Sequence, residues 1–116
     1  MSLPWYIYMI KTCQNTLYTG VTTDVERRFK EHQAGGSKGA RFLKGKAPLT
    51  LVWYEQVCHK QLAMQLEYRV KRLSRTTKDK LVVGGTSITC IFPELFAQAD
   101  VDKSDRASEM EGNIND

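Results

Sequence analysis

Two short segments rich in aromatic and β-branched residues near the start of the chain constrain its fold most strongly. Residues 5–11 read WYIYMIK and residues 17–21 read LYTGV, and such compositions are typical of β-strands. Residues 13–16 between them, CQNT, are of types that form turns. Because so short a connection joins antiparallel strands, we predict a hairpin. Both alternating sets of side chains in the first segment are apolar, so we expect that strand to be covered on both faces.

A helix is expected directly after the hairpin. Residues 23–26, TDVE, fit the capping box, in which a threonine and a glutamate satisfy the first N–H groups of a helix. The glycine pair at 35–36 predicts the end of this helix near residue 33 or 34. Val25 and Phe29 stand four residues apart and mark the face that we expect to point toward the core.

The next segments predict one more strand and two more helices. Residues 37–46 are basic and rich in glycine, so we expect a loop with one short helical turn. Residues 49–57, LTLVWYEQV, predict the third strand. Residues 60–74 predict a second helix and residues 76–83 a short third one. The apolar stripe of the second helix consists of Leu62, Leu66, Val70 and Leu73.

The charge is distributed unevenly along the chain. Residues 1–83 hold 15 Lys+Arg and 6 Asp+Glu, a net charge of +9, whereas residues 84–116 hold 2 and 7, a net charge of −5. A body this basic favours a polyanionic partner such as nucleic acid, although a basic surface without such a role is equally common. We therefore predict one domain over residues 1–83 and an acidic C-terminal tail over 84–116. The tail is expected to be partly disordered, from about residue 97 onward.

Composition also excludes several classes of protein. No stretch approaches the roughly 18 to 20 apolar residues that span a bilayer, and the first residues, MSLP, lack the pattern of a signal peptide. The 3 cysteines form no Cys-x-x-Cys pair, so neither a disulfide framework nor a zinc site is expected. We expect a cytoplasmic protein with no membrane association. The apolar residues within 86–96 are expected to dock on the body or on a protein partner.

Two cation-capable side chains share one edge of the inward face of the first helix. Arg28 and His32 stand four residues apart, and each follows an inward-facing residue by three positions. An arginine that is partly buried requires an anionic partner. Glu67 is the best candidate, because it borders the apolar stripe of the second helix. A plain salt bridge from Arg28 to Glu67, or to Asp24, explains the same pattern.

The ordered motifs around these residues resemble the GIY-YIG nuclease superfamily. The motifs are Tyr6-Ile7-Tyr8, then Tyr18-Thr19-Gly20, then Arg28, His32 and a distant helical Glu67. The chain is most similar to the small stand-alone bacterial members, which are related to the N-terminal nuclease domain of the excision-repair subunit. The resemblance covers residues 5–82. It implies an α/β (α+β) fold in which a small three-stranded antiparallel sheet is flanked by helices, and this agrees with the elements predicted above.

The resemblance also implies roles for five residues. Tyr8 and Tyr18 match the motif tyrosines, one of which serves the family as general base or orients the attacking water. Arg28 matches the arginine that stabilises charge on the phosphate. Glu67 matches the single acidic ligand of a divalent ion, Mg²⁺ or Mn²⁺, and His32 stands where proton transfer can be assisted. On strand tyrosines alone, plain core packing is the simpler interpretation.

Three positions depart from the family pattern. Tyr6 replaces the glycine of the first motif and Thr19 the isoleucine of the second, and both residues are compatible with strands. Val21 stands where the repair nucleases carry a lysine that would lower the pKa of the tyrosine. Without that lysine, the identity of the base stays open between Tyr18 and His32.

Substrate contacts are expected from the basic loop and the first motif. We assign them to Tyr6, Lys38, Arg41 and Lys44, although a solvated basic face is an equally good interpretation of the cluster. The resulting prediction is a metal-dependent endonuclease that hydrolyses phosphodiester bonds in DNA rather than RNA, with structure-selective cutting and a link to DNA repair or processing. The alternatives are a non-catalytic nucleic-acid-binding module, and an interaction protein that uses residues 86–96.

Overall fold

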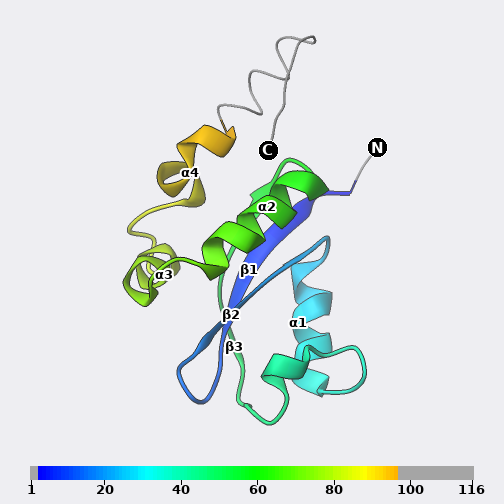
Figure 1. Ribbon diagram of the computed structural model, residues 1–116. Coiled ribbons are helices and arrows are strands. Elements are labelled where there is room, and N and C mark those ends of the chain that lie inside the picture. The colour runs from blue at the N-terminus through cyan, green and yellow to red at the C-terminus, as the bar shows by residue number, and fades with distance from the viewer. Residues whose placement is uncertain (1–2, 97–116) are drawn as a thin grey trace. The chain divides into compact units, whose positions relative to one another are not determined.

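The computed structural model describes residues 3–96, and these form a three-stranded sheet with helices (Figure 1). The predicted architecture, a three-stranded antiparallel sheet flanked by helices, is confirmed. In chain order the elements are β1 (Trp5–Lys11), β2 (Leu17–Thr22), α1 (Val25–Ala34), the 3₁₀ turn η1 (Arg41–Leu43), β3 (Thr50–Val57), α2 (Lys60–Lys71), α3 (Arg75–Val82) and α4 (Ile88–Ile91).

Strand β1 lies in the centre of the sheet, and the strand order is β2-β1-β3 with antiparallel pairing on both sides. Tyr8 pairs with Gly20 on β2 and with Tyr54 on β3. The register with β3 shifts between Met9 and Ile10, which is a β-bulge. Because β2 pairs only with β1 in this sheet, β2 is an edge strand, and its Gly20 lies directly beside Tyr8.

Both faces of β1 are covered, as the apolar sequence predicts. Ile7, Tyr8, Met9 and Ile10 are all buried. Successive side chains on a strand point to opposite faces, and Tyr8 and Ile10 pack with Phe29 of α1. Ile7 and Met9 therefore point to the opposite face, which α2 crosses in Figure 1.

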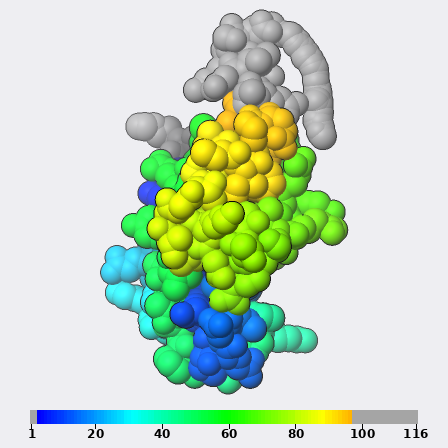
Figure 2. All heavy atoms as spheres, turned by 90° about the vertical axis from the view of Figure 1, so that its left-hand side faces the viewer, coloured from blue at the N-terminus to red at the C-terminus, as the bar shows by residue number. Residues whose placement is uncertain are grey.

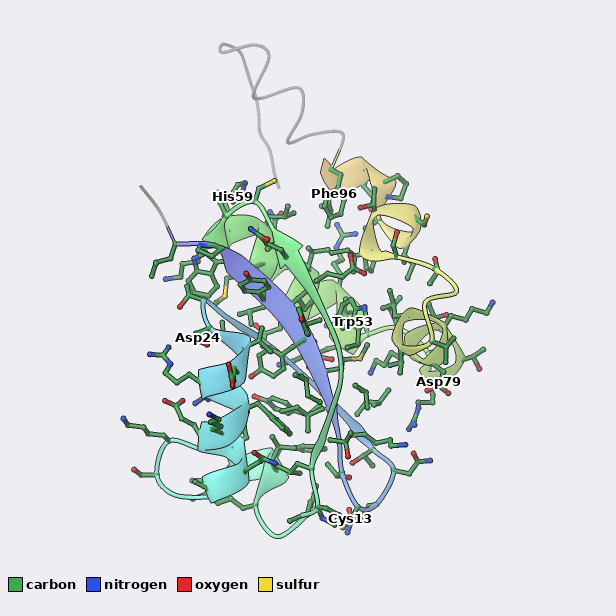
Figure 3. All side chains as sticks on the ribbon, turned by 180° about the vertical axis from the view of Figure 1, so that it is seen from behind. Cys13, Asp24, Trp53, His59, Asp79 and Phe96 are labelled. Atoms are coloured by element: carbon green, nitrogen blue, oxygen red, sulfur yellow. The ribbon has the colours of Figure 1, made fainter. Side chains whose placement is uncertain are left out.

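Helix α1 begins one residue later than predicted. Its N-cap is Asp24, labelled in Figure 3, and the Asp24 carboxylate accepts the N–H of Arg27 at 3.1 Å. The expected cap, Thr23, is displaced because the hydroxyl of Thr22 accepts the Asp24 N–H at 3.1 Å and sets the turn. The helix ends at Ala34, as predicted, and its C-cap Gly35 is left-handed with φ 72°.

The predicted second helix ends earlier than residue 74, and the predicted short third helix follows it as α3. Helix α2 ends at Lys71, and the Ser74 hydroxyl accepts the N–H of Thr77 as the N-cap of α3. A serine is a strong capping residue, and this cap outweighs the apolar stripe that would have continued the helix to residue 74. Arg75 then donates to the main-chain and side-chain oxygens of Asn15. Figure 2 shows α3 beside the β1–β2 turn.

Residues up to Val83 form one compact unit, and a second unit starts at Gly84. Within the second unit, α4 is capped by the Ser87 hydroxyl, which accepts the N–H of Cys90. The prediction of disorder from about residue 97 concerns residues outside those described. Over residues 3–96, none of the helices is both long and apolar enough to cross a bilayer. The three cysteines are free and exposed.

Candidate active site

Tyr8 is the centre of the candidate site, and its ring lies across Gly20 of the edge strand. A β-carbon built on Gly20 would lie 2.5 Å from the Tyr8 Oη and 2.7 Å from its Cζ. Real β-carbons do not approach other atoms this closely, so only glycine leaves room for the ring. The glycine of the second motif is therefore required by the packing of the tyrosine of the first.

The Tyr8 hydroxyl is hydrogen-bonded to His32, the buried residue of α1. The distance from Tyr8 Oη to His32 Nε2 is 2.9 Å. On the other side of the ring, the N–H of Ala40 donates to His32 Nδ1 at 3.1 Å. Because Nδ1 accepts this bond, the neutral ring carries its proton on Nε2 and donates it to Tyr8. The glycine-rich loop thereby fixes the tautomer of the histidine.

Neutral His32 is a positioning group for Tyr8 in this geometry. Burial, and secondly the charge of Arg28, lower the pKa of His32, while Glu31 opposes them. The neutral ring has one lone pair, on Nδ1, and the Ala40 N–H occupies it. A general base needs a lone pair that is open to the proton it takes. Of the two bases that the sequence left open, the geometry thus disfavours His32.

Arg28 is held by its own helix and by the following loop. Its Nη1 donates to Glu31 Oε1 at 2.8 Å and to the main-chain oxygen of Lys38 at 2.6 Å. The alternative interpretation, a plain salt bridge from Arg28 to Glu67 or Asp24, is wrong, because Arg28 pairs with Glu31, three residues along the same helix face.

The charge on Arg28 is secure in this setting. Burial is the largest single influence and acts against it, but the hydrogen bond to Glu31, the interactions with Tyr8 and the charge of Glu31 together outweigh burial, and the pKa of Arg28 is raised. The same hydrogen bond lowers the pKa of Glu31. The side chain of Arg28 keeps 29% of its surface exposed, so the N–H groups that do not bond to Glu31, Lys38 or Tyr8 are available to an anionic ligand.

The influences on the pKa of Tyr8 identify the ionisable groups near its hydroxyl. Burial is the largest influence and raises the pKa of Tyr8 well above its ordinary value, and Tyr18 raises it further. Arg28 lowers this pKa through its charge and a hydrogen bond, and Glu67 raises it. Tyr18, Arg28 and Glu67 therefore each lie within electrostatic range of this hydroxyl.

Tyr18 is half-buried, and its ring joins the buried site to an exposed aromatic side chain. It lies edge-on to the His32 ring with 5.4 Å between centroids, and 6.4 Å from the ring of Tyr8. Its other neighbour is Phe42 of η1, stacked at 5.9 Å. Tyr18 is thus the motif tyrosine with the greater access to solvent, because Tyr8 is only 2% exposed.

Glu67 is the carboxylate that α2 contributes to the site. Its Oε2 lies 3.2 Å from the Nζ of Lys71, one helical turn away, and 22% of its side chain is exposed. Within residues 3–96 no three His, Cys, Asp or Glu side chains come together as a ligand group. One half-buried carboxylate fits an ion such as Mg²⁺, which retains several waters and takes further ligands from substrate phosphates.

Tyr8, Tyr18 and His32 contact one another, and Arg28 and Glu67 act electrostatically on the Tyr8 hydroxyl, whereas the predicted substrate contacts do not form one group. Tyr6 contacts Tyr54 of β3, with ring centroids 6.2 Å apart, and lines a separate pocket beside the start of α1. Lys38 meets Arg28 through its main chain. Arg41 and Lys44 are exposed at the two ends of η1.

Sequence reasoning missed two residues that the site uses. Glu31 was available as a signal, because it stands at the i+3 position from Arg28. Phe42 lies between basic residues in a glycine-rich segment, and an aromatic residue in such a setting is a recognisable sign of nucleic-acid contact. Neither the stacking of Phe42 on Tyr18 nor the Ala40 N–H on His32 could be read from spacing.

The fold and the residues around Tyr8 define the class of this protein. The family model for the GIY-YIG catalytic domain matches residues 4–80, and the chain belongs to this family. Membership indicates a nuclease-type hydrolase and a nucleic-acid substrate.

Relatives of similar size carry the name UPF0213. A UPF0213 protein of Citrobacter koseri is 49% identical over 92 residues, which are 79% of this chain and 90% of that protein. The UPF0213 protein YhbQ of Shigella dysenteriae serotype 1 is 47% identical over 100 residues, 86% of this chain and 94% of that one. The solution NMR structure of the UPF0213 protein BH0048 from Bacillus halodurans has 42% identity and a TM-score of 0.44, covering 69% of this chain and 83% of that one.

The lowered pKa of His32 predicts that stability decreases in mild acid. The folded pKa lies below the ordinary value of about 6.5. The contribution of this residue is therefore complete above about pH 6.5 and decreases as the pH falls toward the folded pKa. Urea unfolding at about pH 7.5 and about pH 5 should show lower stability in acid, and a smaller difference for His32→Gln, which does not titrate.

His59→Asn provides the matched control for this measurement. His59 is exposed and caps α2, its Nδ1 accepting the N–H of Leu62 at 3.2 Å, and asparagine also caps helices. We expect this variant to flatten the pH dependence less than His32→Gln does, because His59 is exposed whereas His32 is buried. An equal flattening in both variants would assign the effect to histidine content rather than to the buried site.

Proposed function

We propose that this chain is a divalent-metal-dependent endonuclease that hydrolyses phosphodiester bonds in DNA. The observation that carries the proposal is that Tyr18, Arg28 and Glu67, all at positions of the family motifs, lie within electrostatic range of the Tyr8 hydroxyl. The basic body, with a net charge of +9 over residues 1–83, supplies long-range attraction for a polyanion.

Arg28 binds the scissile phosphate in this proposal. Its guanidinium is fixed by Glu31 and by the Lys38 carbonyl, so it is oriented before substrate arrives. A donor that is already in place stabilises the charge that develops on phosphate oxygens without reorganisation. The contacts to Glu31 and Lys38 use one nitrogen, Nη1, and the planar fork offers to the phosphate the donors that do not bond to Tyr8.

Tyr18 orients the attacking water, and Tyr8 with His32 forms a rigid support behind it. Tyr8 is buried, its pKa is raised by that burial, and its oxygen receives the His32 N–H, so it is poorly suited to accept a proton. Tyr18 is half-buried and lies against both rings. Its hydroxyl is therefore the better placed of the two to meet a water from solvent.

Glu67 would hold the divalent ion, Mg²⁺ or Mn²⁺, with water in the other positions. The bound ion would act as a Lewis acid on the phosphate and the leaving oxygen. Lys71, which pairs with Glu67 at 3.2 Å, is free to turn to a phosphate once the carboxylate has another partner. One carboxylate suits a single ion better than a metal pair, which needs several carboxylates.

Glu67→Gln is expected to lower Mg²⁺-dependent cleavage of labelled DNA by at least about 100-fold, because the neutral amide is a poor ligand for a hard cation. The assay compares branched, single-stranded and duplex DNA with Mg²⁺, with Mn²⁺ and with EDTA. Glu26→Gln is the control, since Glu26 is an exposed carboxylate of α1 paired with Lys30, and it should cleave like the wild type.

Two outcomes contradict the proposal. If Glu67→Gln cleaves as well as the wild type, Glu67 is not the metal ligand. If the wild type binds DNA but cleaves none of the substrates with either ion, the chain is a non-catalytic nucleic-acid-binding module. The link to repair and a protein partner at residues 86–96 stay predictions. An RNA substrate of the same sequence tests the preference for DNA.

A further inference from the structure

A groove runs beside the candidate site, over the edge strand β2. It has a volume of about 320 Å³, near the lower limit of pockets that take small ligands, about 300 Å³. Three consecutive residues of β2 form one side of it, and η1, α2 and α3 complete it. The lining residues are Leu17, Tyr18, Thr19, Phe42, Lys71 and Lys78. Because neighbouring strand residues point to opposite faces, the groove passes over the edge of the sheet.

A buried hydroxyl without a partner belongs to this lining. Thr19 is 3% exposed, and its Oγ1 has no hydrogen-bond partner within the described part of the chain. Buried polar groups in native proteins are nearly always paired, and an orphaned one calls for a ligand or a water. Thr19 is also the residue that departs from the isoleucine of the second motif, so the departure places a polar group where the motif has an apolar one.

An exposed aromatic ring stands at the other side of the groove. Phe42 is 46% exposed although it is a large apolar residue, and it stacks on Tyr18. The Nζ of Lys46 lies 3.7 Å from the centre of the Phe42 ring. A nucleobase stacks on an aromatic ring more strongly than an exposed cation does. A base would therefore replace the ammonium, which would turn to a phosphate.

Two lysines give the groove a positive charge. Lys71 pairs with Glu67, and Lys78 donates to the main-chain oxygen of Lys71 at 3.4 Å. Burial, and secondly the charge of Arg75, lower the pKa of Lys78, which indicates that this ammonium lacks sufficient solvation or anionic partners. A phosphate group would supply what it lacks.

We infer that this groove binds one unpaired nucleotide next to the scissile phosphate, with its base on Phe42, a polar group at Thr19 and a phosphate at Lys71 and Lys78. A base within a duplex has both faces covered by its neighbours, so only an unstacked nucleotide can occupy the groove. This inference rests on the proposed function and adds the substrate class: DNA with a single-stranded segment at the cut.

The test measures binding in EDTA, so that it does not depend on cleavage. Fluorescence anisotropy compares a single-stranded oligonucleotide, the same strand with one abasic position moved along it, and the blunt duplex. We expect the wild type to prefer the single strand, and Phe42→Ala to bind it about tenfold more weakly with duplex binding unchanged. Phe42→Trp should restore the preference. Tyr68→Ala removes an exposed aromatic residue of α2 outside the groove and should change neither.

Thr19→Val separates a binding role from a structural one. Valine has the same shape without the hydroxyl, so removing an orphaned polar group should leave the urea midpoint equal or higher. We expect single-strand binding to weaken about fivefold all the same, the value of one hydrogen bond. A gain in stability with unchanged binding would overturn the role of Thr19.

Equal affinity of the wild type for the single strand and the duplex, or equal losses on both for Phe42→Ala, would overturn the inference. Those results leave the proposed function intact if the wild type cleaves DNA with Mg²⁺. Conversely, preferential single-strand binding that depends on Phe42 supports the subsite even if no DNA is cleaved, and then only the proposed catalysis fails.

Discussion

Replacing Arg28 by lysine is expected to lower kcat for DNA cleavage by about 10²- to 10³-fold, the cost of losing one preorganised donor to a developing oxyanion. Lysine keeps the positive charge, but its ammonium is a point donor without the planar fork. It cannot at once reach the Glu31 carboxylate, the Lys38 carbonyl and a phosphate oxygen. The wild-type guanidinium contacts the first two through Nη1 alone.

Single-turnover cleavage at saturating protein isolates this effect from DNA binding. Arg27→Lys is the matched control, because Arg27 is the adjacent, exposed arginine of the same helix, and it should stay within about twofold of the wild type, as expected for an exposed charge that is conserved. Thermal unfolding verifies that Arg28→Lys is folded. A kcat for Arg28→Lys within tenfold of the wild type would mean that Arg28 is chiefly a structural partner of Glu31.

The hairpin and the elements around it were predictable because their signals are local. Strand composition, a turn and a glycine pair each act within a few residues, and they locate β1, β2 and the end of α1. The errors also arose locally, where two residues compete for one structural role. Asp24 displaced Thr23 as the N-cap of α1, and Ser74 ended the apolar stripe early by capping α3. Two good capping residues in one stretch cannot be ranked without the turn that precedes them.

The site was predictable only in part, because several of its contacts join distant segments. The ordered motifs predicted that Arg28 and Glu67 belong to one site. The ion-pair partner of each residue was not predicted: Arg28 pairs with Glu31, and Glu67 pairs with Lys71, each on its own helix. The tautomer of His32 depends on the N–H of Ala40, eight residues further along the chain. A bond from a loop main chain leaves no mark in side-chain spacing.

The largest effect on the fold of the site is expected from Gly20→Ala. The added methyl group would lie 2.5 Å from the Tyr8 Oη and 2.7 Å from its Cζ, so the Tyr8 ring must move. That ring is 2% exposed and hydrogen-bonded to His32, which leaves it little room to yield. We expect a loss of about 1–3 kcal/mol in the free energy of unfolding, the range for overpacking a core. Cleavage should fall to near background, because the support for Tyr18 is displaced.

Gly36→Ala and a double variant test whether the effect of Gly20→Ala comes from its clash with Tyr8. Gly36 has nothing within 4 Å of its added β-carbon, so Gly36→Ala should change stability by less than about 0.5 kcal/mol. Tyr8→Phe removes the oxygen that the new methyl group approaches most closely. In a double-mutant cycle measured by urea unfolding, Gly20→Ala should therefore cost less in the Tyr8→Phe background. Equal costs in both backgrounds would show that the methyl group clashes elsewhere, and that Gly20 is not conformationally tied to Tyr8.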